Sequence, residues 1–336
     1  MTLSALEAGL TPLQVEKLRW ETFGHKRALT VKSADQAAQF ASRRGFVLLV
    51  PHAGVRYPSL LEAAVGRPLL DFTWDERLAN LERWKAECLG AGRLACAALV
   101  AGRPALLAPS YLGDFFALSG NQGDLLDHER RCAAGTLSAD AAALCRALAA
   151  GEALGEAELQ ERAGLAGAGR RARFDAALDE AHRQLLVLEA GNVAPRRGSA
   201  AAEERARRAA TSGERVVPRY DLLPRLFPAE VEKSRHATAD AARQRIACRY
   251  LRNVLVESAH EMARVLGWDV AATLEALRAL VTKHMATVHP SSRAQRNLFQ
   301  ATATDLLQVE PAGNPAPIPD RPAEKGKRHK PEEGAA

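Results

Sequence analysis

The sequence contains no cysteine pair of the kind that binds zinc and no apolar run long enough to cross a membrane. None of its five cysteines forms a CxxC pair, which argues against a zinc ribbon or a disulfide framework. No stretch approaches the ~18 consecutive apolar residues that a membrane-spanning helix needs. The N-terminal segment shows no basic-then-apolar secretory pattern. We therefore expect a soluble, cytoplasmic protein.

The motifs of several large enzyme classes are also missing. The sequence has no GxxxxGK[ST] loop, no GxGxxG after a strand, no HExxH and no GxSxG. These are the patterns of phosphate loops, dinucleotide sites, metalloproteases and serine hydrolases. His284 and His289 have the spacing of some zinc ligands but no cysteine partner, so we expect them to pack in the core or on the surface. No metal and no other cofactor is predicted.

Lysine is scarce, whereas arginine is abundant. The chain has nine lysines, 37 arginines, a formal net charge of +6 and a pI of about 9.2. Such a basic balance is typical of proteins whose partner carries phosphates, although an arginine-rich composition also arises in a GC-rich genome. Only the placement of the arginines along the chain separates these two interpretations.

The residue pattern predicts a mainly α-helical protein with small β-hairpins, an α+β fold of tandem winged helix-turn-helix units. Capping residues and apolar faces of helical period indicate helices, and short apolar runs bounded by glycine or proline indicate strands. The order helix, helix, turn, helix, hairpin is that of a winged helix. The expected domains are a first winged-helix-like domain at residues 10–123, a second winged helix with a long basic wing at 136–222, a third winged helix at 238–310, and a disordered basic tail at 311–336.

The expected elements can be given by range. In the first domain, the helices are 12–23, 34–44, 58–65, 74–89 and 111–118, and the strands are 46–51, 93–100 and 105–108. In the second, the helices are 139–150, 156–163 and 170–184, and the strands are 185–189 and 216–220. In the third, the helices are 239–253, 257–266 and 270–283, and the strands are 286–289 and 305–309, with 290–300 as the wing tip. Four tryptophans and the first residue of the last helix are expected to face the core: Trp20, Trp74, Trp84, Trp268 and Val270.

Basic residues occur where a winged helix meets DNA. Arg170, Arg171 and Arg173 begin the third helix of the second unit, the part of a helix-turn-helix that enters the major groove. Wing arginines add phosphate contacts that do not depend on sequence. The predicted DNA-binding residues are Arg170, Arg171, Arg173, Arg196, Arg197, Arg243 and Arg245. The alternatives are ordinary solvated charges, or a winged helix that binds only proteins.

Several runs of the chain resemble a known family. The runs Gly45–Pro51, Tyr57–Arg67, Trp74–Lys85 with the following hairpin, Phe115–Asn121 and Arg173–Asp179 are similar to AlkZ-related proteins. The resemblance covers about residues 10–310. It implies tandem winged helices that cradle DNA, as in the related AlkZ/YcaQ DNA glycosylases, and it implies hydrolysis of the N-glycosidic bond of a damaged or bulky base.

One departure from the family pattern concerns catalysis. In AlkZ-type enzymes a Gln-x-Gln or Gln-x-Asp motif near the first winged helix carries the reaction. The matching stretch here is Leu48-Leu49-Val50, which has no polar side chain. Either the activity is lost or other groups carry it.

Nearby polar residues are the replacement candidates. A carboxylate can orient water and offset the positive charge that develops on the sugar, and a histidine can act as acid or base near neutral pH. The candidate catalytic residues are Asp114, His52, Tyr57 and Glu62, with Arg56 beside them. The ordinary alternatives are a helix cap for Asp114 and a solvated loop residue for His52.

The sequence as a whole therefore predicts a monomeric protein that binds double-stranded DNA and removes a bulky, damaged or modified base. Its role would be DNA repair or defence against modified foreign DNA. The rival from another class is a non-catalytic winged-helix DNA-binding or regulatory protein, which the missing glutamines favour. A scaffold that binds only proteins is the third alternative.

Overall fold

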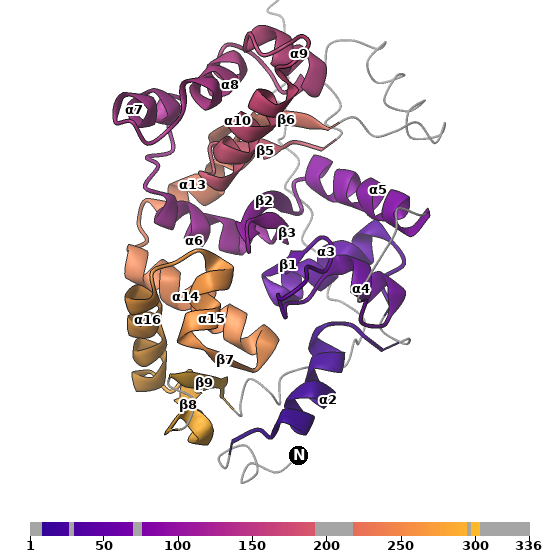
Figure 1. Cartoon of the computed structure of the whole chain (residues 1–336), viewed down its shortest axis with the longest axis vertical. Coiled ribbons are helices and arrows are strands. Elements are labelled where there is room, and N and C mark those ends of the chain that lie inside the picture. Colours follow the sequence, from indigo (N-terminus) through magenta and orange to yellow (C-terminus); the bar gives the residue numbers. More distant parts are fainter. Residues whose placement is uncertain (1–8, 27–29, 70–75, 192–217, 294–296, 303–336) are drawn as a thin grey trace, which may run out of the picture.

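The computed structural model describes residues 9–26, 30–69, 76–191, 218–293 and 297–302. Three units follow one another along the chain, each with helices and one small sheet (Figure 1). The second unit occupies the top of the figure, and the first and third units lie beside one another at the other end. Several predicted features lie outside the described residues: Arg196, Arg197, Trp74, the strand 305–309 and the tail 311–336.

The first unit starts with two helices whose beginnings the sequence specifies. Its elements are α2 (Pro12–Thr22), α3 (Ala34–Arg44), β1 (Phe46–Leu48), α4 (Leu60–Val65), α5 (Glu76–Gly90), β2 (Ala95–Val100) and β3 (Arg103–Leu107). The side chains of Thr11 and Ser33 accept hydrogen bonds from backbone N–H groups of α2 and α3, which satisfies donors that a helix start leaves open. Gly45, with a φ of 75°, ends α3.

The second and third units repeat the order of elements from α3 to β3. The second contains α8 (Ala139–Ala149), β4 (Leu154–Gly155), α9 (Glu156–Arg162), α10 (Arg171–Arg183), β5 (Val187–Glu189) and β6 (Arg219–Leu222). The third contains α14 (Ala239–Val254), β7 (Val256–Ser258), α15 (Ala259–Leu266), α16 (Val270–Thr282), β8 (Ala286–Val288) and β9 (Leu298–Ala301), with a 3₁₀ turn at Pro290–Arg293.

The three sheets share one topology. Their strand orders are β1-β3-β2, β4-β6-β5 and β7-β9-β8, and all pairs are antiparallel. In each unit the last strand lies between the first two, so the hairpin packs back on the strand that precedes the helix-turn-helix. This arrangement confirms the predicted mainly helical fold of tandem winged helices.

Among the described residues, four further helices connect the units: α6 (Pro109–Ser119), α7 (Asp127–Ala133), α12 (Leu223–Leu226) and α13 (Pro228–Ser234). The helix α6 packs on both α13 and α14. One hydrophobic cluster includes Phe46 of the first unit and Leu255 of the third, and the Ala101 N–H donates to the Val265 carbonyl at 2.6 Å. The first and third units therefore share a core. Lys85 of α5 lies 3.0 Å from Glu189 of β5, which links the first unit to the second.

The predicted strand positions need correction. The last strand of the third unit, β9, lies at Leu298–Ala301, and its first three residues belong to the stretch expected as the wing tip, 290–300. The positive φ of Asn297, 65°, turns the chain there and lets β9 pair with both β7 and β8. The strand β6 spans Arg219–Leu222, whereas the predicted strand spans 216–220, of which residues 216 and 217 lie outside the described part of the chain. The strands β4 and β7 have two and three residues, too few for a pattern to reveal.

Two side chains expected in the core are exposed. Trp20 is 42% exposed, because α2 buries the face of Val15 and Arg19 and Trp20 falls on the next face. Val270 is 40% exposed, since it occupies the first position of α16, directly after the Asp269 cap. Trp84 and Trp268 are half-buried against apolar clusters. His289 is buried, and its Nε2 lies 3.0 Å from the Leu10 carbonyl.

Candidate nucleic-acid interface and catalytic residues

The three arginines at the start of α10 are exposed, but each is bonded to another group of the protein. Arg171 pairs with Glu156 and with Asp175 on its own helix, and Arg173 makes a two-pronged pair with Asp140 at 2.7 and 2.9 Å. Arg170 donates to the Gly164 carbonyl at 2.6 Å. Surface pairs of this kind contribute little to stability. A phosphate can therefore compete with the carboxylates for Arg171 and Arg173.

The two predicted arginines of α14 also have partners. Arg243 lies 3.1 Å from Asp240 and over the ring of Trp268, 5.9 Å from its centroid. The Arg245 Nε donates to an oxygen of Asp114 on α6 at 2.9 Å. A residue predicted to bind DNA and a residue predicted to be catalytic thus form one ion pair.

The sequence suggested that Asp114 begins a helix. In the structure it lies in the middle of α6 instead. Its side chain is 9% exposed, whereas that of Arg245 is 50% exposed. The hydrogen bond to Asp114 raises the pKa of Arg245, so the guanidinium stays charged. The geometry indicates a counter-ion that positions Arg245 on the surface.

Tyr57 lies in the shared core of the first and third units. It is 2% exposed and is stacked with Phe46 and Tyr250, whose ring centroids are 5.4 and 4.9 Å away. Its hydroxyl oxygen accepts from the Asn253 amide at 2.7 Å, and burial raises its pKa well above the ordinary value. In this structure the side chain cannot reach a bound nucleotide.

Glu62 is buried in α4 beside the first-unit core. One carboxylate oxygen accepts from the Ser59 hydroxyl at 2.9 Å, and the other accepts from the Leu69 N–H at 3.0 Å. His25 Nε2 lies 3.7 Å away. Because both oxygens are engaged with protein donors, Glu62 closes the end of the loop that leads out of α4.

His52 is the most accessible of the four candidate catalytic residues, and it is half-buried. Its carbonyl accepts from the Val55 N–H at 3.0 Å, which closes a tight turn. The Arg264 guanidinium of α15 donates to the Gly54 carbonyl in this turn at 2.7 Å. The loop after β1 therefore lies at the junction of the first and third units.

A carboxyl group that the sequence did not single out lies at the same junction. Glu257 of β7 is half-buried, and one of its oxygens accepts from the Ser258 N–H at 2.9 Å. Burial raises its pKa, against the opposing charges of Arg19 and of Arg56 in the His52 loop. A carboxyl group with a raised pKa is typical of acid–base sites. No motif marks Glu257, because its neighbours come from far away in the chain.

The stretch that matches the family's glutamine motif is apolar in three dimensions as well. Leu48 is fully buried in β1 opposite Ala105, Leu49 is 7% exposed, and Val50 is half-buried. The Leu49 carbonyl accepts from the Leu61 N–H at 3.1 Å. These side chains pack into the first unit and offer no hydrogen bond to a substrate.

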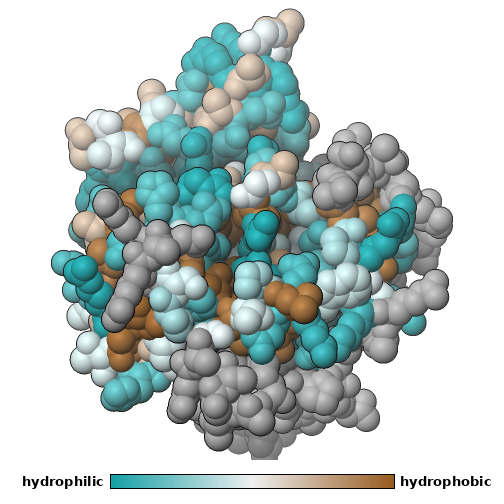
Figure 2. Space-filling model, turned by 60° about the horizontal axis from the view of Figure 1, so that its bottom comes forward, coloured by the Kyte–Doolittle hydropathy of each residue, from teal (hydrophilic) through white to brown (hydrophobic). Residues whose placement is uncertain are grey.

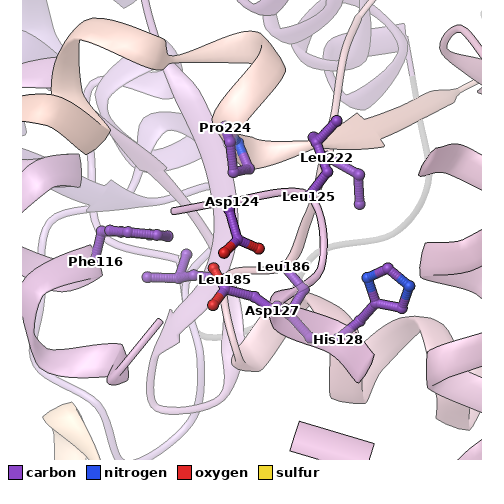
Figure 3. Close-up of a pocket in the computed structure, with 9 residues that line it drawn as sticks. All are labelled: Phe116, Asp124, Leu125, Asp127, His128, Leu185, Leu186, Leu222 and Pro224. Carbon is purple, nitrogen blue, oxygen red and sulfur yellow. The ribbon is translucent and has the colours of Figure 1, made fainter. Parts of the chain in front are cut away.

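A small pocket lies between the α6–α7 loop and the second unit (Figure 3). The carboxylates of Asp124 and Asp127 point toward one another, and the ring of His128 points away from them. Asp127 accepts from two backbone N–H groups at 2.7 and 2.9 Å, and both carboxylates pair with Arg130. Because these oxygens hold the loop, the pocket has the features of a structural junction.

The described part of the chain contains no group of three or more His, Cys, Asp or Glu side chains placed to hold a metal ion. None of the helices in that part is long and apolar enough to cross a membrane.

Comparison with known proteins places this arrangement in a family. Residues 31–267 match the family model described as AlkZ related. The chain belongs to the AlkZ-related family. Among solved structures, this AlkZ-related chain is similar to the DNA glycosylase AlkZ of Streptomyces sahachiroi, with a TM-score of 0.51 and 16% sequence identity over 88% of this chain and 72% of that chain. A search of curated proteins gives no match. At this identity the likeness shows a common fold.

Proposed function

We propose that this AlkZ-related protein binds duplex DNA as a monomer and hydrolyses the N-glycosidic bond of a bulky, damaged or modified base, leaving an abasic site. The observation that carries the proposal is membership of the AlkZ-related family over residues 31–267, together with a fold shared with a DNA glycosylase. The repeated winged-helix units and the exposed arginines of α10 support binding to a duplex. The role is DNA repair or defence against modified foreign DNA.

The reaction requires water at the anomeric carbon and a group that offsets the positive charge of the sugar. The proposed acid–base group in the loop after β1 is His52, because it is more accessible than the other three candidates. The proposed carboxyl group is Glu257, because its pKa is raised and it lies at the same junction. Asp114 acts through Arg245, and Tyr57 and Glu62 hold the surrounding structure.

The activity is tested with duplexes that carry different modified bases, followed by alkali, which breaks the strand at abasic sites. The wild-type protein is expected to produce breaks at the modified position. His52→Gln and Glu257→Gln are each expected to lower the cleavage rate by about 10²–10⁴-fold, the usual contribution of a general acid or base. Glu62→Gln is the comparison variant, because the Glu62 oxygens are both bonded inside the protein.

The second candidate function is non-catalytic DNA binding. The buried apolar side chains of Leu48 and Leu49, where AlkZ-type enzymes have the glutamine motif, favour it. Strand breaks that require the protein contradict this alternative. Salt-dependent binding without breaks across a broad set of modified bases supports it.

A further inference from the structure

Two guanidinium groups at the junction of α3, α6 and α14 are held by uncharged oxygens. Arg249 of α14 donates from Nε to the Tyr111 hydroxyl at 2.8 Å and from Nη1 to the Arg43 carbonyl at 3.0 Å. Arg44 of α3 donates to the carbonyls of Thr22 and Glu21. These contacts orient the two side chains without supplying a negative charge. We call this group of residues, Arg43, Arg44, Tyr111 and Arg249, the α3–α14 cluster.

The positive charges of the α3–α14 cluster act on one another. Burial, followed by the neighbouring charges of Arg43 and Arg249, lowers the pKa of Arg44 to about 10. Positive charge is therefore concentrated where α3 meets α14, beside the Arg249 guanidinium. An anion bound to this guanidinium would also be attracted by the charges of Arg43 and Arg44.

Part of the cluster faces solvent. Arg43 is exposed, and Arg249 is half-buried. A guanidinium has five N–H donors, and the two bonds of Arg249 use two of them. Arg245, one helical turn before Arg249, has a half-exposed side chain above its buried partner Asp114. Unused donors and accessible positive charge thus occur at one place.

The close approach of α3 to α14 preorganises the site. Gly45 has a φ of 75°, and a Cβ atom there would lie 2.7 Å from the Tyr111 ring and 2.8 Å from Cγ of Arg249. Only glycine fits this position without displacing the side chains that orient Arg249. Tyr111 therefore has two roles, as a packing surface and as the hydrogen-bond acceptor that fixes the guanidinium.

We propose that Arg249, with the charges of Arg43 and Arg44 beside it, forms a phosphodiester-binding site for the DNA backbone. The inference rests on the proposed function and adds a contact outside the helix-turn-helix of the second unit. A fixed guanidinium fork suits phosphate oxygens. Contacts of this kind position a protein on the duplex and carry no sequence information.

The test measures the affinity for an unmodified DNA duplex over a range of salt concentrations. Arg249→Gln is expected to weaken binding about tenfold, the effect of one charge-assisted hydrogen bond. It is also expected to reduce the slope of log affinity against log salt by about 0.9, the value for one lost phosphate contact. Arg249→Lys keeps the charge and the slope. Tyr111→Phe keeps the slope but lowers the affinity by a smaller factor, because the guanidinium is less well oriented.

The control is Arg235→Gln. Arg235 is an exposed arginine at the C-terminal end of α13, and its side chain pairs with Glu232. The control variant removes the same charge and should change neither quantity. Arg43→Gln, at an exposed position, is also expected to lower the slope of log affinity against log salt. This variant tests the site if Arg249→Gln does not fold. A wild-type slope in both Arg249→Gln and Arg43→Gln overturns the inference alone. Absence of duplex binding by the wild-type protein overturns the proposed function together with it.

Discussion

The Asp114 carboxylate on α6 accepts a hydrogen bond from the Arg245 Nε on α14 at 2.9 Å. The two residues are 131 positions apart in the chain, and the pair lies where α6 packs against α14. Its carboxylate is buried and its guanidinium half-exposed. The buried carboxylate thus fixes where the Arg245 charge is presented to solvent. The face of the molecule at the bottom of Figure 1 mixes hydrophilic and apolar residues (Figure 2).

The pair should stabilise the fold. Asp114→Ala removes the acceptor of a charge-assisted hydrogen bond and is expected to lower the free energy of unfolding by about 1–3 kcal/mol. Asp114→Asn keeps an acceptor oxygen and should cost less. Urea unfolding of both variants measures the difference. If Asp114 is instead a catalytic residue, Asp114→Asn will fold normally and lose base removal completely, which contradicts a positioning role.

Gly45 should be irreplaceable for steric reasons as well as for its backbone conformation. Gly45→Ala forces a Cβ to within 2.7 Å of Tyr111 and is expected to cost about 2–4 kcal/mol, since overpacking adds to the penalty for a positive φ. Gly54→Ala is the matched control, because Gly54 has a φ of 76° with open space around it. It should cost only about 1–2 kcal/mol. Equal losses in thermal unfolding would show that the contact with Tyr111 is unimportant.

The Lys85–Glu189 pair should hold the second unit against the first. Both side chains are 12% exposed, with Nζ and Oε2 3.0 Å apart. Lys85→Met leaves a buried carboxylate without its ammonium and is expected to cost about 3–5 kcal/mol. The double change Lys85→Met with Glu189→Leu should recover much of this loss, because no buried carboxylate is then left unpaired. Glu82, which also lies 2.7 Å from the Lys85 ammonium, loses its partner, but its side chain is 34% exposed.

The control for the Lys85 variant is Arg162→Met, which removes the exposed pair with Glu158, where both side chains are 48% exposed. Its cost should be about 0–1 kcal/mol. Denaturant unfolding compares the two losses. If Lys85→Met costs no more than Arg162→Met, the pair does not join the units.

His182 should make stability depend on pH. Burial, with the nearby Lys85 ammonium, lowers the pKa of His182 to about 4 from an ordinary value of 6.5. The folded state therefore rejects a proton that the unfolded state binds between pH 4 and 6.5. The stability that the neutral His182 contributes is fully present above pH 6.5 and is lost as the pH drops toward 4, and the total loss is about 3 kcal/mol.

The measurement is the free energy of unfolding as a function of pH. His182→Leu should flatten the curve between pH 4 and 6.5, whereas His236→Leu, at an exposed position, should keep the wild-type slope. Identical slopes for wild-type protein and His182→Leu would contradict the assignment.

Local signals in the sequence located most of the helices. The caps Thr11, Ser33, Ser138 and Asp269 each accept a backbone hydrogen bond at the expected helix start. These features depend on a few neighbouring residues, so they can be read from the chain. The two- and three-residue strands β4 and β7 carry no period long enough to detect and form because β6 and β9 lie beside them.

The candidate site was less accessible to prediction. The sequence suggested Arg245 and Asp114 for separate roles, and only the packing of α6 on α14 pairs them. Likewise, Arg249 becomes notable because Tyr111 and the end of α3 surround it. Such relationships depend on contacts between residues more than a hundred positions apart, which a single sequence does not encode locally.

Removal of a base from duplex DNA is the central claim, and an alkali-cleavage assay tests it most directly. Duplexes with a broad range of bulky, damaged and modified bases are incubated with the wild-type protein and then treated with alkali. We predict strand breaks at the modified position of at least one duplex, with a slower rate for His52→Gln than for Glu62→Gln. Intact strands across the whole set, from protein that still binds the duplexes, would contradict a glycosylase and favour a DNA-binding protein without catalysis.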